Sequence, residues 1–270
     1  MKRLRFHYRM KIDFDIPVKE HRFTLKCLPK DNSRQKINTL TYEVFPNRFI
    51  SRSYDGFGND CIYGLCAEQH NAFLIDLEGE AECGLAEYES EGAETDAAIF
   101  RYQTEHTQPG RGIREYYKEL QIRSLDRKIC NDRIEIALFY LHQLHADYEY
   151  RSGSTQITTT AEEAFAQGCG VCQDYAHILL SLLRIGHIPC RYVTGMMLGE
   201  GLSHAWVEVF DGARWIALDP TNDIVVGDDH IRIAAGRDYR DCLINQGMFT
   251  GCGGKAEQDQ SICVQVEEIR

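Results

Sequence analysis

The chain has 270 residues, of which 43% are hydrophobic and 26% charged, a composition typical of a globular protein and not of a disordered one. Thirty basic residues against 41 acidic ones give a net charge of -11, which argues against nucleic acid as a partner, because such binding relies on Lys and Arg neutralising phosphates. No apolar run approaches the roughly 20 residues that span a bilayer, and no signal-peptide stretch follows the basic start. We therefore expect a cytoplasmic protein with no membrane partner, whose 11 cysteines are mostly reduced.

We predict a β domain for residues 1–85. Residues 22–28 alternate well, with Phe23, Leu25 and Cys27 on one side. Short strands separated by turns are typical of a sheet or sandwich, so this part is predicted to be a β-sandwich-like domain, smaller than the one that follows. The other strand candidates are residues 6–15, 40–46, 61–68 and 72–81.

An acidic segment follows this domain. Eight Asp and Glu residues, and no Lys or Arg, lie between Glu78 and Asp96. Because a run of one charge sign is typically solvated, residues 86–112 are predicted to form an acidic connector, and an acidic docking surface is the less favoured interpretation.

Residues 113–270 are predicted to form an α+β domain. Its clearest helix covers residues 132–145, where Ile134, Leu138 and Leu141 recur at three- and four-residue steps and Asp132 is placed to cap the start. Three further helices are predicted: one at 113–120, one that starts at a Thr160–Glu163 capping box, and one at 172–185. Strands are predicted at 188–197, 204–210 and 214–220, and a tight turn at 211–213 joins the last two.

Three residues of this domain form a possible catalytic group. Cys172 stands at a glycine-preceded helix start, His204 opens a strand, and Asp219 lies near the end of the next strand. The positive end of the helix dipole favours a thiolate, and a neighbouring histidine can hold the ion pair and later protonate a leaving group. A carboxylate behind the histidine fixes its tautomer. Paired strands bring side chains of one face within about 5 Å of each other, which suits the last two roles.

The segments around these residues resemble a known family. Residues 170–177 (GVCQDYAH), 203–209 (SHAWVEV) and 215–222 (WIALDPTN) resemble three motifs of the transglutaminase-like superfamily, and more narrowly its bacterial putative cysteine protease branch. Residues 230–241 resemble a further block of that branch, and the first 85 residues, including FGN at 57–59, resemble its N-terminal β domain. After residue 239 the family usually continues with a proline-containing stretch, which is missing here and leaves the conformation of residues 240–248 open.

The resemblance implies a papain-like catalytic core in which Cys172 is the nucleophile, His204 the general base and acid, and Asp219 the orienting carboxylate. The implied reaction is acyl transfer at amide bonds of proteins or peptides, with no cofactor and no metal ion. Either water or an amine could resolve the thioester. Hydrolysis is the expected outcome, and transfer to an amine, as in a transglutaminase, is the alternative. The substrate, the second oxyanion donor and the oligomeric state stay open.

Different interpretations concern the remaining cysteines and histidines. Cys169 and Cys172 have the spacing of a dithiol redox site or of half a zinc site, but His187, Cys190 and His204 could complete a zinc site only by assumption. A packed role for Cys169 is favoured over a reversible disulfide that would switch Cys172 off. A non-enzymatic binding module on the same fold is the alternative of another class. Structural or incidental roles are favoured for His142, His145, Cys242, Cys252 and Cys263, and core packing for Trp206 and Trp215.

Overall fold

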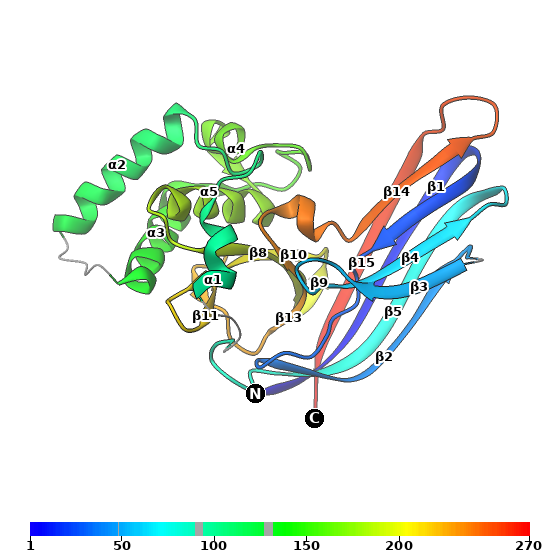
Figure 1. Cartoon of the computed structure of the whole chain (residues 1–270), viewed down its shortest axis with the longest axis horizontal. Coiled ribbons are helices and arrows are strands. Elements are labelled where there is room, and N and C mark those ends of the chain that lie inside the picture. The colour runs from blue at the N-terminus through cyan, green and yellow to red at the C-terminus, as the bar shows by residue number, and fades with distance from the viewer. Residues whose placement is uncertain (48, 90–93, 127–131) are drawn as a thin grey trace.

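The computed structural model describes residues 1–47, 49–89, 94–126 and 132–270. It has two lobes, one in which helices pack beside a small sheet and one formed by a long sheet (Figure 1). The fold is therefore α+β, as the sequence predicts. The first and last residues lie close together, since Arg3 pairs with Ile269 in the long sheet. None of the helices in the described ranges is long and apolar enough to cross a membrane.

The long sheet is organised around one strand, β1 (Lys2–Leu25), which the sequence predicts as two separate strands. Alternate residues from Leu4 to Phe14 are buried, because successive side chains of a strand point to opposite faces. The first half of β1 pairs with β5 (His70–Cys83) and β15 (Gln258–Ile269), and the second half with β4 (Asp60–Cys66) and β14 (Asn245–Gly251). The remaining strands are β2 (Gln35–Phe45) next to β5, β3 (Phe49–Tyr54) next to β4, and β9 (Gly199–Gly201) next to β15.

The pairing of β14 and β15 corrects a predicted boundary. The sequence prediction includes residues 245–269 in the catalytic domain 113–270, but both strands pair antiparallel with β1. The apolar face of β1 explains this, because Tyr8 lies opposite Val264 and Phe6 opposite Val266, and all four side chains are buried. The β domain is therefore built from both ends of the chain.

The second lobe is built on a five-stranded sheet in the order β12-β11-β10-β8-β13. Helix α5 (Cys172–Ile185) packs against β10 and β8, with Leu179 and Leu183 fully buried. Asp132 caps α3 and the Thr160–Glu163 capping box begins α4, which confirms both predicted helix starts. The strands are β8 (Cys190–Met197), β10 (His204–Phe210), β11 (Trp215–Asp219), β12 (Ile224–Val225) and β13 (His230–Gly236), and the other helices are α2 (Arg111–Asp126), α3 (Arg133–Asp147) and α4 (Ala161–Gln167).

The predicted connector is packed more closely than its acidity suggests. Glu89 is 2% exposed and forms an isolated β-bridge with Trp215, so this part of the segment is not a solvated surface. Phe100, in the short helical stretch of α1 (Glu94–Ala97) and η1 (Ala98–Arg101), is also buried. Residues 90–93 lie outside the described residues. The correction has a physical reason, because Glu89 is neutralised by Arg191 and Arg232, which are far away in sequence.

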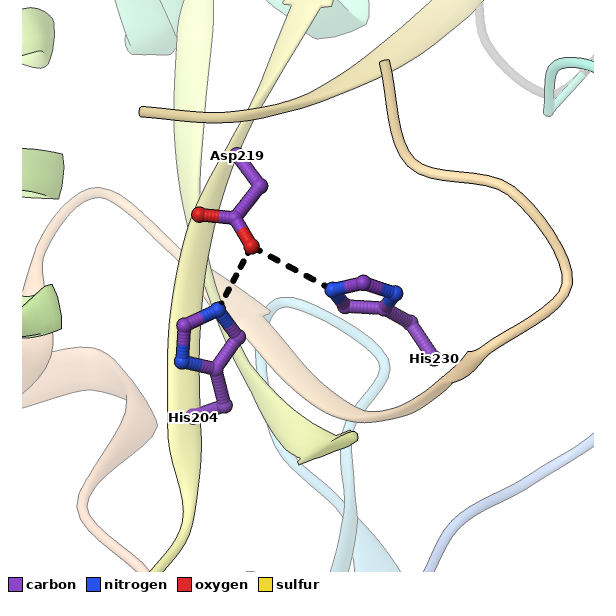
Figure 2. Close-up of side chains that lie close together, drawn as sticks. All are labelled: His204, Asp219 and His230. Atoms are coloured by element: carbon purple, nitrogen blue, oxygen red, sulfur yellow. Dashed lines mark hydrogen bonds and ion pairs between the residues drawn. The ribbon is translucent and has the colours of Figure 1, made fainter. Parts of the chain in front are cut away.

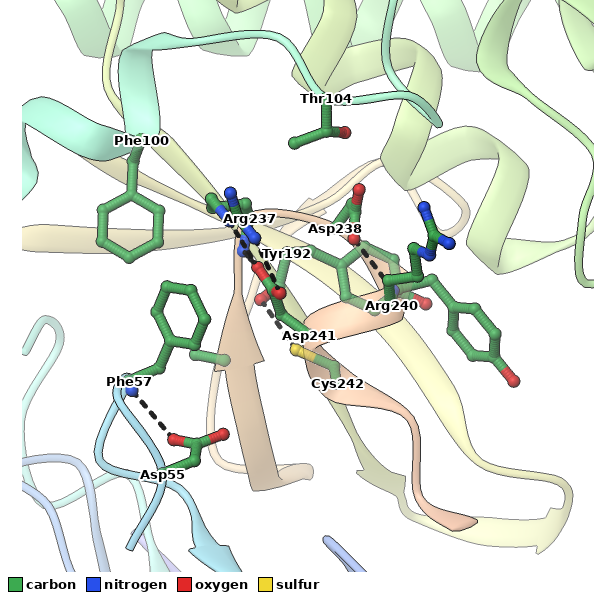
Figure 3. A network of polar contacts seen from close by, with 12 residues as sticks. Asp55, Phe57, Phe100, Thr104, Tyr192, Arg237, Asp238, Arg240, Asp241 and Cys242 are labelled. Carbon is green, nitrogen blue, oxygen red and sulfur yellow. Dashed lines mark hydrogen bonds and ion pairs between the residues drawn. The ribbon is translucent and has the colours of Figure 1, made fainter. Parts of the chain in front are cut away.

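The two lobes meet where the turn at residues 55–59 contacts the segment after β13 (Figure 3). Asp55 accepts a hydrogen bond from the backbone N–H of Phe57 at 2.9 Å. The guanidinium of Arg237 lies over the ring of Phe57 at 5.7 Å and donates two hydrogen bonds to Asp241. The segment whose conformation the missing proline stretch left open is thus a short 3-10 helix, η2 (Tyr239–Cys242), which leads into β14.

Candidate active site

Cys172 begins α5 after a tight turn that contains glycine. Gly168 ends α4 in the left-handed conformation with φ 70°, and Cys169–Gly170 form the two-residue strand β7. A Cβ atom on Gly170 would lie 2.5 Å from Oδ2 of Asp174, which is closer than real Cβ contacts, so the turn requires glycine at this position. Cys172 is partly exposed at the helix N-terminus, as predicted, whereas Cys169 is buried, which fits a packed role.

The side chain of Asp174 closes the start of α5. Its Oδ2 accepts hydrogen bonds from the N–H of Val171 at 2.7 Å and from the hydroxyl of Thr155 at 2.6 Å. The N–H groups of Asp174 and Tyr175 both donate to the carbonyl of Val171. Cys172 is the first residue of α5, where a backbone N–H has no acceptor within the helix. This N–H group, at the positive end of the helix, is therefore available to stabilise an oxyanion at the thiol.

Tyr150 lies next to this helix start. Strand β6 (Glu149–Tyr150) pairs in parallel with β7 and places Tyr150 opposite Gly170, two residues before Cys172. The side chain is 54% exposed, and its pKa is raised by partial burial and by the negative charge of Cys172. The phenol is therefore a protonated hydrogen-bond donor within electrostatic reach of the thiol. Tyr150 could not be singled out from the sequence, because a tyrosine that far before a cysteine has no recognisable spacing.

His204 and Asp219 come together on the β10–β11 hairpin, which the sequence predicts (Figure 2). The Nε2 of His204 lies 2.7 Å from Oδ2 of Asp219. Because Nε2 is engaged by the carboxylate, Nδ1 is the ring nitrogen left for Cys172, which interacts electrostatically with His204. The structure thus brings together all three predicted residues.

The carboxylate of Asp219 is fully buried and held at both oxygens. Oδ1 accepts hydrogen bonds from the N–H groups of Thr221 at 2.9 Å and Asn222 at 3.3 Å. Oδ2 also accepts one from the side-chain amide of Asn222 at 2.6 Å. The loop after β11 therefore fixes the orientation of the carboxylate toward His204.

The charges of the pair reinforce each other. Burial alone would lower the pKa of His204, but the hydrogen bond to Asp219 and the interactions with Cys172 raise it to about 10. Burial would raise the pKa of Asp219, but the hydrogen bonds from His204 and then from His230 hold it well below its usual value. At neutral pH the site therefore contains an imidazolium paired with a carboxylate.

A second histidine, His230, also contacts Asp219. It opens β13, is 6% exposed, and its Nε2 lies 3.3 Å from Oδ2 of Asp219 (Figure 2). No role for His230 is predicted from the sequence, although it begins the 230–241 block of the family resemblance. His204, Asp219 and His230 are metal-binding residue types with ligand atoms within 4.8 Å of one another. Since Oδ2 already accepts hydrogen bonds from both imidazoles and from Asn222, we interpret the group as a hydrogen-bonded assembly.

The structure separates the residues that a zinc site would need. Cys190 pairs with Val209 in the β8–β10 ladder, whereas His204 pairs with Gly195. These two pairs are five residues apart along β8, a distance of about 16 Å at the usual rise per residue. The histidines and tryptophans for which structural roles are favoured have other contacts: His142 contacts Asp223, His145 lies 3.3 Å from the carbonyl of Pro220, and Trp206 and Trp215 are buried.

A buried charge cluster lies behind the catalytic strand β10, which carries His204, and it could not be predicted from the sequence. Arg191 donates to Glu208 at 2.6 Å and to Glu89 at 2.7 Å, and Arg232 contacts both carboxylates. Burial would raise the pKa of Glu208, but Arg191 and Arg232 lower it, so the carboxylate is ionised. The cluster joins the connector to β8, β10 and β13, and so holds the strand that carries His204. Its members had no sequence signal because they lie far apart in the chain.

Two family descriptions match the chain: "Transglutaminase-like superfamily" over residues 123–220 and "Bacterial transglutaminase-like N-terminal region" over residues 4–82, together more than half of it. The chain is 35% identical over 131 residues to an uncharacterized protein of Mycobacterium leprae, covering 45% of this chain and 46% of that protein. It is 34% identical over 132 residues to an uncharacterized protein of Mycobacterium tuberculosis, covering 43% of this chain and 42% of that protein. It thus matches less than half the length of these relatives.

The fold is similar to the crystal structure of a protein from Cytophaga hutchinsonii that is named a putative cysteine protease. The TM-score is 0.79 and the sequence identity 20%, and the match covers 100% of this chain and 91% of that chain. At this identity the likeness concerns the fold, including the arrangement of a long sheet beside a helical lobe.

Proposed function

Because the chain belongs to the transglutaminase-like superfamily, we propose that it is a thiol-dependent acyl-transfer enzyme that acts on amide bonds of proteins or peptides. The observation that carries this proposal is the 2.7 Å contact between His204 and the buried Asp219, on the hairpin that brings the imidazole to Cys172. A scaffold that only binds a partner has no need of a thiol, an imidazolium and a carboxylate in this order.

The proposed reaction gives each of the three residues a distinct role. The Cys172 thiolate attacks the amide carbonyl, and the resulting oxyanion accepts a hydrogen bond from the N–H of Cys172. The imidazolium of His204 gives its proton to the departing nitrogen, so the C–N bond breaks and a thioester remains. His204, now neutral, accepts a proton from the incoming water or amine. Asp219 keeps the imidazole oriented and stabilises its charge through both steps.

Hydrolysis is the reaction we propose for the second step. Cys172 is partly exposed and the neighbouring Tyr150 is 54% exposed, so water reaches the thioester. Transfer to an amine would need a pocket that excludes water. We place the enzyme in the cytoplasm, where a reducing environment keeps the thiol free, and protein or peptide substrates are its proposed partners.

Mass spectrometry of glutamine-containing and peptide substrates, with and without a primary amine, tests the proposal. We expect a cleaved or deamidated product whether or not the amine is present, and none with Cys172→Ala. An amine adduct as the main product would replace hydrolysis by transamidation. The thiol is tested separately by alkylation near neutral pH, where Cys172 should react faster than the exposed Cys263 and His204→Ala should abolish the difference. Equal alkylation of the two cysteines in the unmodified protein would contradict an enzymatic role.

A further inference from the structure

We propose that the N-terminal β domain positions Asp219 through His230, and that one water molecule bound between Arg34, Trp206 and His230 completes this link. The inference rests on the proposed function for the meaning of Asp219, but its contacts are independent of any substrate. It gives the β domain a role in the chemistry of the catalytic lobe, and it makes His230 a positioning residue.

The contact with Asp219 determines the tautomer of His230. Its Nε2 lies 3.3 Å from Oδ2 of the ionised Asp219, which can only accept, so Nε2 carries the proton and donates it. In a neutral imidazole Nδ1 is then an acceptor. The Nδ1 atom of His230 is buried and has no hydrogen-bond partner among the described residues. The imidazole therefore needs a donor on the side opposite Asp219.

Two unpaired donors lie near this imidazole. The indole Nε1 of Trp206 and the Nε of Arg34 are also buried, and the described ranges supply no acceptor for either. The rings of Trp206 and His230 meet edge to face, with centroids 5.2 Å apart. Both N–H groups can only donate. Leaving such groups unpaired in the interior is unfavourable, so their occurrence together points to a shared acceptor.

A cavity joins the three residues. It is lined by Arg34, Trp206 and His230 and also by Glu89 and Glu208, and its volume is about 10 Å³, measured as the space for the centre of a water molecule. That is room for one water. A water molecule there would accept from Trp206 and Arg34, donate one proton to Nδ1 of His230 and donate the other to a carboxylate of the lining. All four of its hydrogen bonds are accounted for, which is the pattern of buried structural water.

Two consecutive residues of the β domain bind the backbone of the segment that contains His230. The guanidinium of Arg34 donates to the carbonyls of Val226 at 2.5 Å and Gly227 at 3.1 Å, just before β13. Gln35, which opens β2, donates to the carbonyl of Arg232 at 2.8 Å and accepts from its N–H at 2.7 Å. The β domain thus forms hydrogen bonds with the backbone on both sides of His230. Through the water, Arg34 also sets the tautomer that lets His230 donate to Asp219.

The test uses the full-length protein and two readouts that need no turnover: the NMR titration of His204 and the rate of Cys172 alkylation at pH 7. His230→Leu removes the donor that holds Oδ2 of Asp219 from the side of β13, so that the carboxylate is positioned only by the loop after β11 and by His204. The substitution should lower the proton affinity of His204 and the alkylation rate about tenfold each. His230→Gln keeps an N–H near the position of Nε2 and should restore both to within about threefold. A residue that only supports the fold would change the melting temperature and leave the titration unmoved.

Arg34→Met tests the water link, because it keeps the apolar stem and removes the donors. It should lower the proton affinity of His204 and the rate of Cys172 alkylation by about threefold each. The matched control is Arg3→Met, which replaces an exposed arginine of the β domain that pairs with Glu80 and should leave both quantities unchanged. A folded His230→Leu protein with the His204 titration of the unmodified chain would overturn the inference, as would Arg34→Met behaving like Arg3→Met. If His230→Leu does not fold, His230→Gln and Arg34→Met decide between these outcomes. If no substrate is ever turned over while these shifts occur, the proposed function fails and the link to Asp219 stands.

Discussion

The side-chain amide of Asn59 forms two hydrogen bonds with the backbone of Ala235, donating to its carbonyl and accepting from its N–H, both at 2.8 Å. Asn59 belongs to the turn of the β domain, whereas Ala235 lies in β13 of the catalytic lobe. The side chain therefore pairs with β13 as a neighbouring strand would. Since Asn59 is 1% exposed, water cannot replace these bonds if they are lost.

We expect Asn59→Ala to lower the free energy of unfolding by about 2–4 kcal/mol, because it leaves a buried N–H and a buried C=O of Ala235 without partners. Urea denaturation of the variant measures this loss. Asn38→Ala is the control, since Asn38 makes only an exposed contact to Glu82, and it should change stability by less than about 0.5 kcal/mol. Equal effects of the two substitutions would mean that the Asn59 bonds do not couple the lobes.

The sequence predicts the parts of the site that are carried by local pattern. Cys172 could be placed at a helix start because glycines precede it and an apolar helical pattern follows. His204 and Asp219 could be placed close together because their two strands are separated by a three-residue turn, which forces a hairpin. In each case the residues that determine the structure lie close together in the sequence.

The features that the sequence could not predict all depend on contacts between distant residues. The pairing of β15 with β1 joins residues more than 240 positions apart, so no local pattern distinguishes β15 from a strand of the catalytic lobe. Glu89 looked solvated because its arginine partners lie in β8 and β13. The contact of His230 with Asp219 likewise depends on β13 lying beside β8, and a single histidine at a strand start does not reveal it.

The charge cluster behind the catalytic strand should be the most sensitive polar feature of the core. Glu208→Gln keeps the shape but removes one of two carboxylates that neutralise Arg191 and Arg232, and we expect a loss of about 3–5 kcal/mol of stability. The matched control is Glu267→Gln, which breaks a surface pair with Arg5 and should cost at most about 1 kcal/mol. Thermal and urea unfolding measure both. A small effect of Glu208→Gln would indicate that the arginines find other acceptors.

The stability contributed by the His204–Asp219 pair should depend on pH in a defined direction. The pKa of His204 in the folded protein, about 10, lies above the value of about 6.5 for a free histidine, so its contribution is complete below pH 6.5 and is lost as the pH rises toward 10. The pKa of Asp219 is lowered, so its contribution is present above pH ~4 and is lost on further acidification. The window in which both act therefore lies between about pH 4 and 6.5.

Urea denaturation of the unmodified protein and of His204→Gln, compared at pH 6, 8 and 10, measures this dependence. We expect the difference in unfolding free energy to be largest at pH 6 and to shrink steadily toward pH 10. In an Asp219→Asn background the same comparison should lose most of its slope, because the carboxylate that raises the pKa of His204 is gone. A difference that grows with pH would show that His204 is neutral in the folded protein.

We propose Tyr150 as the second hydrogen-bond donor to the oxyanion, since β6 sets it beside the N-terminus of α5 and partial burial and Cys172 raise the pKa of its phenol. We expect Tyr150→Phe to lower kcat about 10- to 100-fold with little change in KM, because the lost bond forms only in the transition state. Alkylation of Cys172 builds no oxyanion and should keep its rate. Tyr102→Phe, which alters a 69% exposed tyrosine, is the control and should affect neither measurement. A parallel fall in alkylation would instead assign Tyr150 to activation of the thiol, and an unchanged kcat would remove it from the reaction.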